Sequence, residues 1–276
     1  MNRITFQFYP YAKQKALTMS YDDGQVYDRR LIEIFNRYGI RGTFHLISGL
    51  LDHSGYVTSA EVSQLYGGHE VAGHTRLHNP MSMLPDGGVL QELLEDKRAL
   101  ETLCGIPLSG MSYPYGDCME GWTAVLPKLG IRYARTVQST GRFSLPQNFL
   151  LWNPTCHHTD RLMERLQAFQ HTNPWDWMPL LYVWGHSFEF AREENWTLIE
   201  QFCKAAGGDH TVWYATNAEI EAYITALRRL QWNVEQTVVY NPSAIPVWIG
   251  VDKEPVCVKP GVYQPLPKQK VGKSKT

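Results

Sequence analysis

The chain has 276 residues, 43% of them hydrophobic, so it can bury a large core as one barrel-sized domain or as two smaller domains. Its 26 basic and 27 acidic residues leave a formal charge of -1, which gives no overall electrostatic reason to expect a nucleic-acid partner. No segment approaches the ~20 consecutive apolar residues of a transmembrane helix, so no membrane partner is expected.

The cysteines point to a reducing compartment. The chain has five, an odd number, scattered and without a CxxC pair: Cys104, Cys118, Cys156, Cys203 and Cys257. This pattern argues against a disulfide framework and against a zinc ribbon. The N-terminal MNRITFQFYP also lacks the apolar core of a signal peptide. We therefore expect a cytoplasmic protein, or a secreted one if a signal peptide has been trimmed.

Short apolar segments alternate with segments of helical periodicity along most of the chain. The expected strands are ALTMS (16–20), GTFHLIS (42–48), HEVAGH (69–74), GMSYPY (110–115), RYARTV (132–137), FLLW (149–152), LLYVWGH (180–186) and TVWYAT (211–216). Strands that alternate with helices indicate parallel βαβ units. Seven or eight units within about 230 residues predict an α/β fold, a (β/α) barrel over residues 1–230.

The composition changes after Leu230. The segment is rich in Val and Pro and carries turn signals at Asn241-Pro242, Asp252-Lys253 and Pro260-Gly261. We expect residues 231–276 to form a short β-strand appendage with antiparallel strands and a flexible tail.

Two adjacent carboxylates, Asp22 and Asp23, follow the first apolar strand in SYDDG. Neither aspartate favours a strand or a helix, and a simple turn would explain this motif by itself. In a (β/α) barrel, however, the reactive groups lie at the carboxyl ends of the strands. The motif is therefore a candidate site if other reactive residues also follow strands.

The histidines of GHTRLH supply such a second feature. His74 and His78 stand four residues apart, so on a helical turn both rings would point to one side and suit a divalent metal. An HxxxH pair alone is weak evidence, but a carboxylate at a strand end completes an Asp-His-His metal site. The other aspartate would then be free to take a proton from a water that the metal activates.

Two further features follow strands. SYPYG (112–116) can place backbone N–H groups and a tyrosine next to the metal. His186 ends the strongly apolar strand of LYVWGH and is a candidate general acid, because imidazole titrates near neutral pH.

SYDDG, HTRLH, the PYG of SYPYG and VWGH occur in an order that resembles the NodB-like polysaccharide deacetylases of carbohydrate esterase family 4. The resemblance covers roughly residues 15–220 and implies a distorted (β/α) barrel of about seven parallel strands, an acetylated carbohydrate substrate, and zinc, cobalt or nickel as the metal. It implies these roles: Asp22 as base, His186 as acid, the backbone N–H of Tyr115 as oxyanion donor, and Asp23, His74 and His78 as metal ligands.

The chain departs from the family pattern at two places. Ser112 stands where the third motif carries an arginine that orients the catalytic aspartate, and Arg135 is either its substitute or an ordinary salt-bridging residue. No clear Asp-x-Trp motif is present to tune the acidic histidine. Asp176 in PWDW and Glu189 in HSFEF are candidate replacements.

The sequence thus predicts a metal-dependent hydrolase that removes N- or O-linked acetyl groups from a poly- or oligosaccharide. Three alternatives stay open at this point. The barrel could act as an amidase on a small non-carbohydrate substrate, or be an inactive carbohydrate-binding relative. Two histidines and one carboxylate also describe the facial triad of non-haem iron oxygenases, although that hypothesis leaves Asp22 without a purpose.

Overall fold

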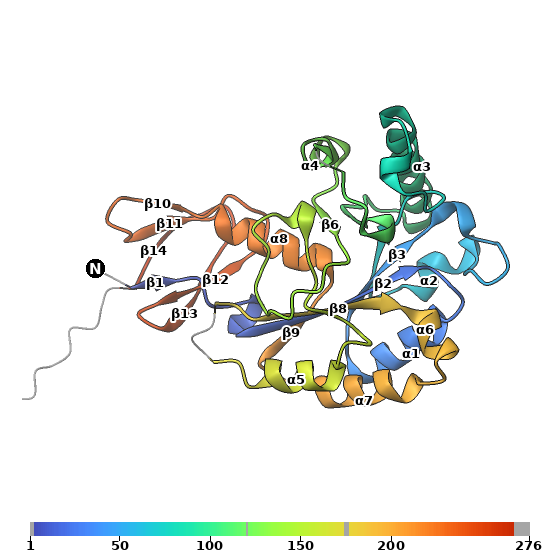
Figure 1. Cartoon of the computed structure of the whole chain (residues 1–276). Helices are drawn as coiled ribbons and strands as arrows, with labels where there is room; N and C mark the ends of the chain where they lie inside the picture. Colours follow the sequence, from blue (N-terminus) through green and yellow to red (C-terminus); the bar gives the residue numbers. More distant parts are fainter. Residues whose placement is uncertain (1–2, 120, 174–176, 268–276) are drawn as a thin grey trace, which may run out of the picture.

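The computed structural model describes residues 3–119, 121–173 and 177–267. Its main sheet is all parallel and curves into an open half-barrel with the strand order β6-β5-β4-β3-β2-β8-β7, and β9 also pairs with β2 (Figure 1). The strands are β2 (Lys15–Asp23), β3 (Gly42–Leu46), β4 (Glu70–Gly73), β5 (Gly110–Ser112), β6 (Tyr133–Arg135), β7 (Cys156–His157), β8 (Leu180–His186) and β9 (Val212–Tyr214). The predicted α/β fold, a distorted barrel of about seven parallel strands, is confirmed.

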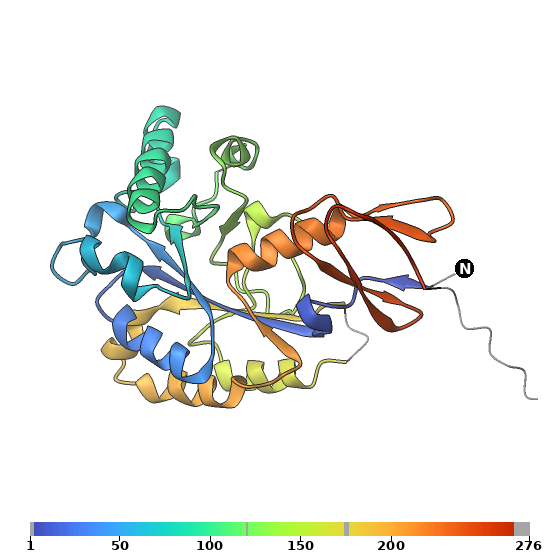
Figure 2. The ribbon, with the colours of Figure 1, turned by 180° about the vertical axis from the view of Figure 1, so that it is seen from behind.

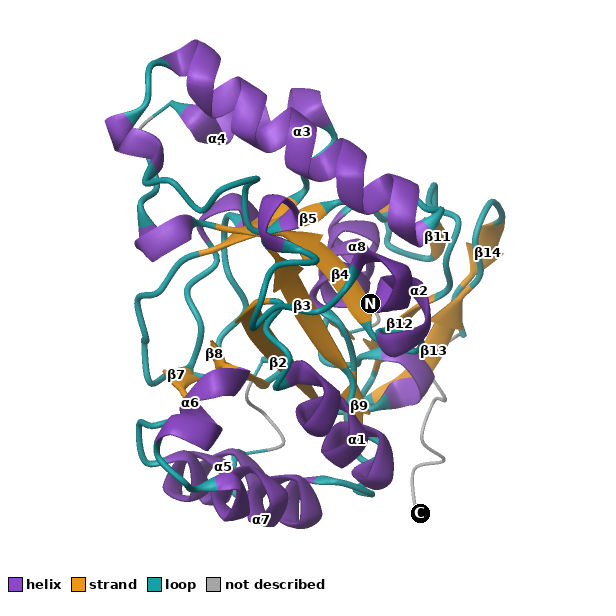
Figure 3. Cartoon of the chain, turned by 90° about the vertical axis from the view of Figure 1, so that its right-hand side faces the viewer, coloured by secondary structure: helices purple, strands orange, loops and turns teal. Residues whose placement is uncertain are grey.

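Helices pack around the curved sheet. They are α1 (Asp28–Tyr38), α2 (Val62–Leu65), α3 (Asp86–Cys104), α4 (Trp122–Val125), α5 (Leu162–Gln170), α6 (Ser187–Arg192), α7 (Trp196–Ala206) and α8 (Asn217–Arg228). Helices α1, α5, α6 and α7 form one layer, and α3 packs beside β4 at a distance from them (Figure 3). Leu100 of α3 belongs to the same hydrophobic cluster as residues of α1 and α7, so these helices cover one face of the curved sheet. Among the described residues no helix is both long and apolar enough to cross a membrane.

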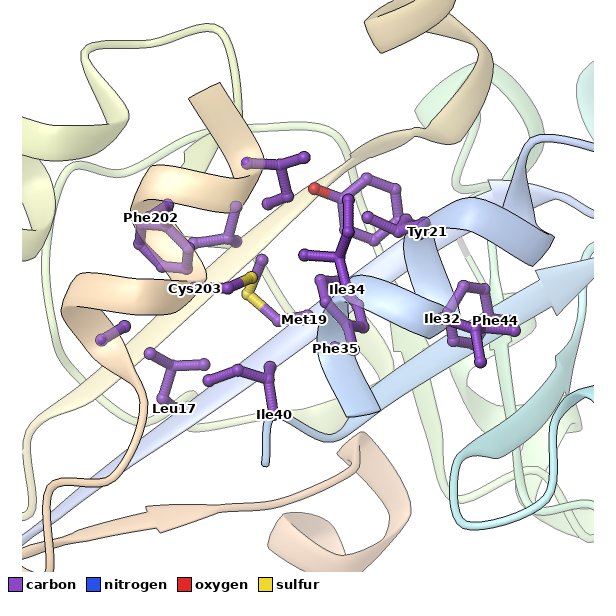
Figure 4. Packing of buried hydrophobic residues seen from close by; sticks show 14 of the residues in the cluster. Leu17, Met19, Tyr21, Ile32, Ile34, Phe35, Ile40, Phe44, Phe202 and Cys203 are labelled. Carbon is purple, nitrogen blue, oxygen red and sulfur yellow. The ribbon is translucent and has the colours of Figure 1, made fainter. Parts of the chain in front are cut away.

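Strand β2 carries apolar side chains on one face and, near its carboxyl end, polar side chains on the other. Side chains alternate between the two faces of a strand, and the odd-numbered Leu17, Met19 and Tyr21 pack in the hydrophobic cluster formed with α1 and α7 (Figure 4). The even-numbered residues Ser20 and Asp22 are polar, buried and hydrogen-bonded on the other face. The polar groups near the carboxyl end of β2 therefore lie on the face opposite the cluster formed with α1 and α7.

The register of β2 aligns three strand ends. Asp22 is the parallel partner of His45 on β3 and of His186 on β8. Because neighbouring residues in register share a face, the two imidazoles flank the carboxylate of Asp22. His45 is fully buried and was not singled out from the sequence.

The C-terminal strands are antiparallel and form two three-stranded sheets, one of which includes β1 (Ile4–Thr5). These strands are β10 (Gln231–Trp232), β11 (Val238–Tyr240), β12 (Val247–Val251), β13 (Glu254–Val258) and β14 (Tyr263–Pro265). Figure 2 shows α8 between them and the parallel sheet. One hydrophobic cluster joins Ala16 and Tyr182 of the half-barrel to Val247 and Ile249, so the predicted boundary at residue 230 does not separate two cores.

One predicted strand is wrong, and one strand of the parallel sheet was missed. FLLW forms a short 3-10 turn, Phe149–Leu151, because the side chain of Asn148 accepts a hydrogen bond from the backbone N–H of Leu150. The unpredicted strand β7 is only two residues long, Cys156 and His157, and has no apolar run to indicate it. All five cysteines are free thiols.

Candidate active site

Three potential metal ligands converge at the carboxyl end of the sheet. The ligand atoms of Asp23, His74 and His78 all lie within 4.8 Å of one another. Asp23 ends β2 in the left-handed region, with φ at 83°, so its side chain leaves the alternation of the strand. The structure therefore brings together the Asp-His-His set that the spacing of SYDDG and HTRLH predicted.

The HTRLH segment is a loop and not the helical turn that we assumed. Thr75 and His78 have φ values of 62° and 60°, which no α-helix contains. The rings of His74 and His78 still approach, with centroids 4.6 Å apart. The proximity of the two rings was predicted for the wrong reason.

Two acidic residues of α3 hold this loop in place. The backbone N–H of His74 donates to Asp96 Oδ2 at 3.1 Å, and that of Leu77 donates to Glu92 Oε2 at 2.8 Å. These carboxylates stand one helical turn apart and substitute for the carbonyls that a helix would offer. Burial raises the pKa of Asp96 to about 7. Neither residue was singled out from the sequence, although two acids spaced by four on the buried side of a helix are a usable signal.

The orientation of His74 follows from a hydrogen bond. Its Nδ1 lies 2.9 Å from the backbone carbonyl oxygen of Ser112, which can only accept, so Nδ1 carries the proton. Nε2 is left with its lone pair and faces Asp23 Oδ1 at 3.7 Å. Burial lowers the pKa of His74 to about 4, so the ring is neutral near pH 7, as a metal ligand must be.

The residues present fit a divalent metal ion. Asp23 Oδ1 is buried and has no hydrogen-bond partner within the described part of the chain, which is costly unless a cation or proton compensates it. Burial raises the pKa of Asp23 to about 6. One carboxylate and two imidazoles are the donor set of zinc and of related borderline ions.

Asp22 lies beside the ligands but has its own partners. Its side chain is 3% exposed, Ser112 Oγ donates to its Oδ1 at 3.2 Å, and Arg135 forms an ion pair with its Oδ2. Burial alone would raise the pKa of Asp22, but the guanidinium of Arg135 outweighs burial and holds that pKa well below its usual range. Arg135 is itself fully buried and stacks on Trp184 at 4.4 Å, so it is not a surface salt bridge.

His186 stands at the end of β8 on the other side of Asp22. Its Nδ1 lies 3.3 Å from Oε2 of Glu189, three residues further on in α6. Burial alone would lower the pKa of His186, but the contact with Glu189 and the charge of Asp22 raise it overall. Glu189 therefore takes the place of a partner for His186, while Asp176 lies outside the described residues.

Tyr115 lies at the mouth of the site in the 3-10 turn Pro114–Gly116, with φ at 57°. The residue is 66% exposed, and its ring centroid lies 4.5 Å from that of His78. The predicted tyrosine next to the ligand set is thus present. The oxyanion role of its backbone N–H stays a prediction.

Comparison with known proteins points to one family. The family model of polysaccharide deacetylases matches residues 10–134, which contain both SYDDG and HTRLH. The resemblance seen in the sequence is confirmed by this match. No curated protein matches the chain significantly.

Two solved structures with TM-scores above 0.5 share the fold at low sequence identity. A Mycobacterium smegmatis protein assigned as a polysaccharide deacetylase is 16% identical with a TM-score of 0.61, and the match covers 80% of this chain and 93% of that one. A pseudoenzyme of carbohydrate esterase family 4 from Bacillus anthracis is 15% identical with a TM-score of 0.51, covering 75% and 65%. A Streptococcus pyogenes deacetylase solved with acetate is 17% identical, with a TM-score of 0.42. That match covers 44% of this chain and 55% of the relative, so the chain spans about half the length of that relative.

Proposed function

We propose that this chain, whose residues 10–134 match the polysaccharide deacetylase family, is a metal-dependent hydrolase that removes N- or O-linked acetyl groups from a poly- or oligosaccharide. The observation that carries the proposal is the different surroundings of two adjacent carboxylates. Both oxygens of Asp22 have protein partners, whereas Asp23 Oδ1 has none among the described residues and faces His74. One acid is thus held for proton transfer and the other is left to bind a cation.

Asp23, His74 and His78 would hold the metal ion. When bound, a divalent ion of this kind polarises the acetyl carbonyl and makes a water molecule more acidic. The chain contributes a neutral His74 whose lone pair is already directed at Asp23. Zinc, cobalt and nickel all suit this donor set.

Asp22 is the general base. Its pKa lies well below the usual range, so the carboxylate is ionised at every pH at which a deacetylase works. Arg135 and Ser112 hold the two oxygens in position, which lets Asp22 accept a proton from the attacking water. A tetrahedral oxyanion then needs a donor, and the backbone N–H of Tyr115 serves as one, a contact worth about 3–4 kcal/mol.

His186 is the general acid. It lies beside Asp22 in register, and its raised pKa keeps a larger share of the ring protonated near neutral pH. The C–N or C–O bond of the tetrahedral intermediate breaks, and His186 gives its proton to the departing amine or hydroxyl group. Acetate is the second product.

Acetate release from a panel of acetylated glycans, measured together with the metal content of the purified protein, tests this function. We expect at least one bound divalent ion and acetate from at least one N- or O-acetylated glycan. A protein that binds the ion but releases no acetate from any glycan would be an inactive relative, as the Bacillus anthracis pseudoenzyme is. Hydrolysis of small amides without hydrolysis of glycans would favour the amidase hypothesis instead.

A further inference from the structure

A second group of ligand-type side chains lies behind His186. His157 ends β7, His158 follows it, and their Nε2 atoms lie 3.1 and 3.3 Å from Oε2 of Glu189 on α6. All three ligand atoms lie within 4.8 Å of one another. Their side chains are 19%, 1% and 13% exposed, so the group is nearly enclosed but can be reached from solvent through His157.

We propose that His157, His158 and Glu189 form a second binding site for a divalent transition-metal ion, separate from Asp23, His74 and His78. Two imidazole nitrogens and one carboxylate oxygen are the donors that zinc, cobalt, nickel and copper prefer. Magnesium and calcium require sets made mostly of oxygen atoms, so they do not suit this group. Three protein ligands leave room for a fourth, exchangeable ligand.

The spacing of the donors agrees with such an ion. Zinc binds nitrogen and carboxylate oxygen at about 2.0–2.1 Å, so two ligands of a tetrahedral ion stand about 3.3–3.4 Å apart. The distances from Glu189 Oε2 to the two Nε2 atoms, 3.1 and 3.3 Å, are close to this ligand–ligand separation. The same distances suit N–H···O hydrogen bonds in the metal-free protein, in which Nε2 of each ring carries the proton. Metal binding would move that proton to Nδ1.

The ligands are held in place before any ion binds. The His158 ring lies between Phe190 and Tyr21, with centroid distances of 4.2 and 5.7 Å and nearly parallel planes. Gly185 is required there, because a Cβ atom at that position would stand 2.0 Å from His158 Nδ1. Nδ1 of His157 lies 2.8 Å from Thr159 Oγ1, the kind of outer hydrogen bond that orients a ligating histidine.

The second site should be weaker than the first. Nδ1 of His158 is buried without a hydrogen-bond partner within the described residues, so a proton moved there stays unpaired. At the first site, Nδ1 of His74 already donates to the carbonyl of Ser112. A buried N–H without a partner costs free energy. This cost lowers the metal affinity of the second site and does not arise at the first.

Metal at the second site would act on the first through Glu189. Its Oε2 is also the atom that lies 3.3 Å from His186 Nδ1. An ion bound to this oxygen competes with His186 for it, and the His186 ring loses the contact that positions it. This consequence rests on the proposed function: excess metal should inhibit deacetylation by filling the second site.

The test counts metal ions in a protein whose first site has been removed. The His74→Ala/His78→Ala variant, stripped with a chelator, is titrated with zinc in equilibrium dialysis, and cobalt absorption reports the coordination. We expect about two zinc ions in the wild type and about one in this variant. Adding His157→Gln or His158→Gln should weaken the remaining site roughly tenfold or more. Adding His171→Gln instead, which changes an exposed histidine elsewhere, should leave it unchanged.

A first-site variant that binds no zinc at micromolar concentration while its circular dichroism matches the wild type overturns the proposal. So does zinc that remains bound after both His157→Gln and His158→Gln, because it must then lie elsewhere. His157→Gln is included because its side chain is partly exposed, so this substitution disturbs folding less than a change at the buried His158. Zinc counts do not depend on turnover, so a protein that deacetylates no glycan can still confirm or refute the second site. Where activity is found, inhibition by excess zinc should diminish in His157→Gln.

Discussion

Ser112 and Arg135 are direct partners in the parallel register of β5 and β6, and both side chains bind the carboxylate of Asp22. This relationship explains the departure from the family pattern at Ser112. The arginine stands one strand further along the sheet, where its guanidinium pairs with Asp22 Oδ2 while Ser112 Oγ donates to Oδ1. The site therefore keeps an arginine–aspartate pair although the motif that normally supplies it has lost its arginine.

Arg135→Met should impair both activity and stability. It leaves the buried charge of Asp22 unpaired, which typically costs about 3–5 kcal/mol of unfolding free energy, and it raises the pKa of Asp22. Urea denaturation and the initial rate of acetate release measure the two effects. The double variant Asp22→Asn/Arg135→Met should recover stability but not activity, since it removes both charges. Wild-type activity in Arg135→Met would show that Asp22 needs no orienting cation.

The adjacent aspartates should separate metal binding from turnover. Asp22→Asn should keep the ion of the first site but lose most of the acetate release, because the amide cannot accept a proton as a base. Asp23→Asn should lose that ion and the activity together, and His78→Ala should do the same. Metal analysis alongside initial rates measures both quantities, and the two Asp→Asn variants are nearly isosteric with the wild type. Full turnover in Asp22→Asn would remove the proposed base.

Metal uptake by the first site should weaken in acid. The pKa of Asp23 is raised to about 6, so below that pH an ion must displace a proton from this carboxyl group. The apparent affinity for zinc should therefore fall by about tenfold per pH unit below pH 6, and more steeply where His78 also takes up a proton. Competition dialysis between pH 5 and 7 measures this affinity, with His157→Gln as the background in which the second site is weakened. An affinity independent of pH across this range contradicts the raised pKa.

Glu189→Gln should move the basic limb of the rate profile to lower pH. The contact with Glu189 helps to raise the pKa of His186, and an amide supplies no negative charge in its place. A general acid works only while protonated, so activity disappears as the pH rises through the pKa of His186. That loss should begin at lower pH in the variant, as kcat measured from pH 6 to 10 will show. An unchanged basic limb would mean that His186 is not the acid, or that Glu189 does not act on it.

The free energy of unfolding should fall as the pH rises from about 4 to 7, because of the buried carboxyl group of Asp28. It is fully buried, with hydrogen bonds from Tyr66 at 2.7 Å and Ser187 at 2.5 Å, and burial raises its pKa to about 7. Between its unfolded and folded pKa values the folded state holds the extra proton, so stability falls with rising pH. Asp28→Asn removes the carboxyl group that takes up this proton. Urea denaturation at pH 4.5 and 7 should therefore show a smaller change in the free energy of unfolding between the two pH values. An identical dependence in both proteins would place the titrating group elsewhere.

The sequence by itself determined the local features of this protein. The alternation along β2, apolar at Leu17, Met19 and Tyr21, predicted a strand with one face in the core, and SYDDG at its end predicted the carboxylates of the site. The helical stripe of α1 was found in the same way. Periods of 2.0 and 3.6 residues depend only on neighbouring positions, so they can be read without knowing the fold.

Only the tertiary structure decided which distant residues meet. Arg135 and Asp22 lie 113 positions apart and form a pair because β6 and β2 belong to one curved sheet. His157 and His158 reach Glu189 because β7 pairs with β8, the strand that leads into α6. Strand order and register depend on the packing of the whole core, and a one-residue slip would turn each of these side chains to the opposite face. No local pattern contains that information.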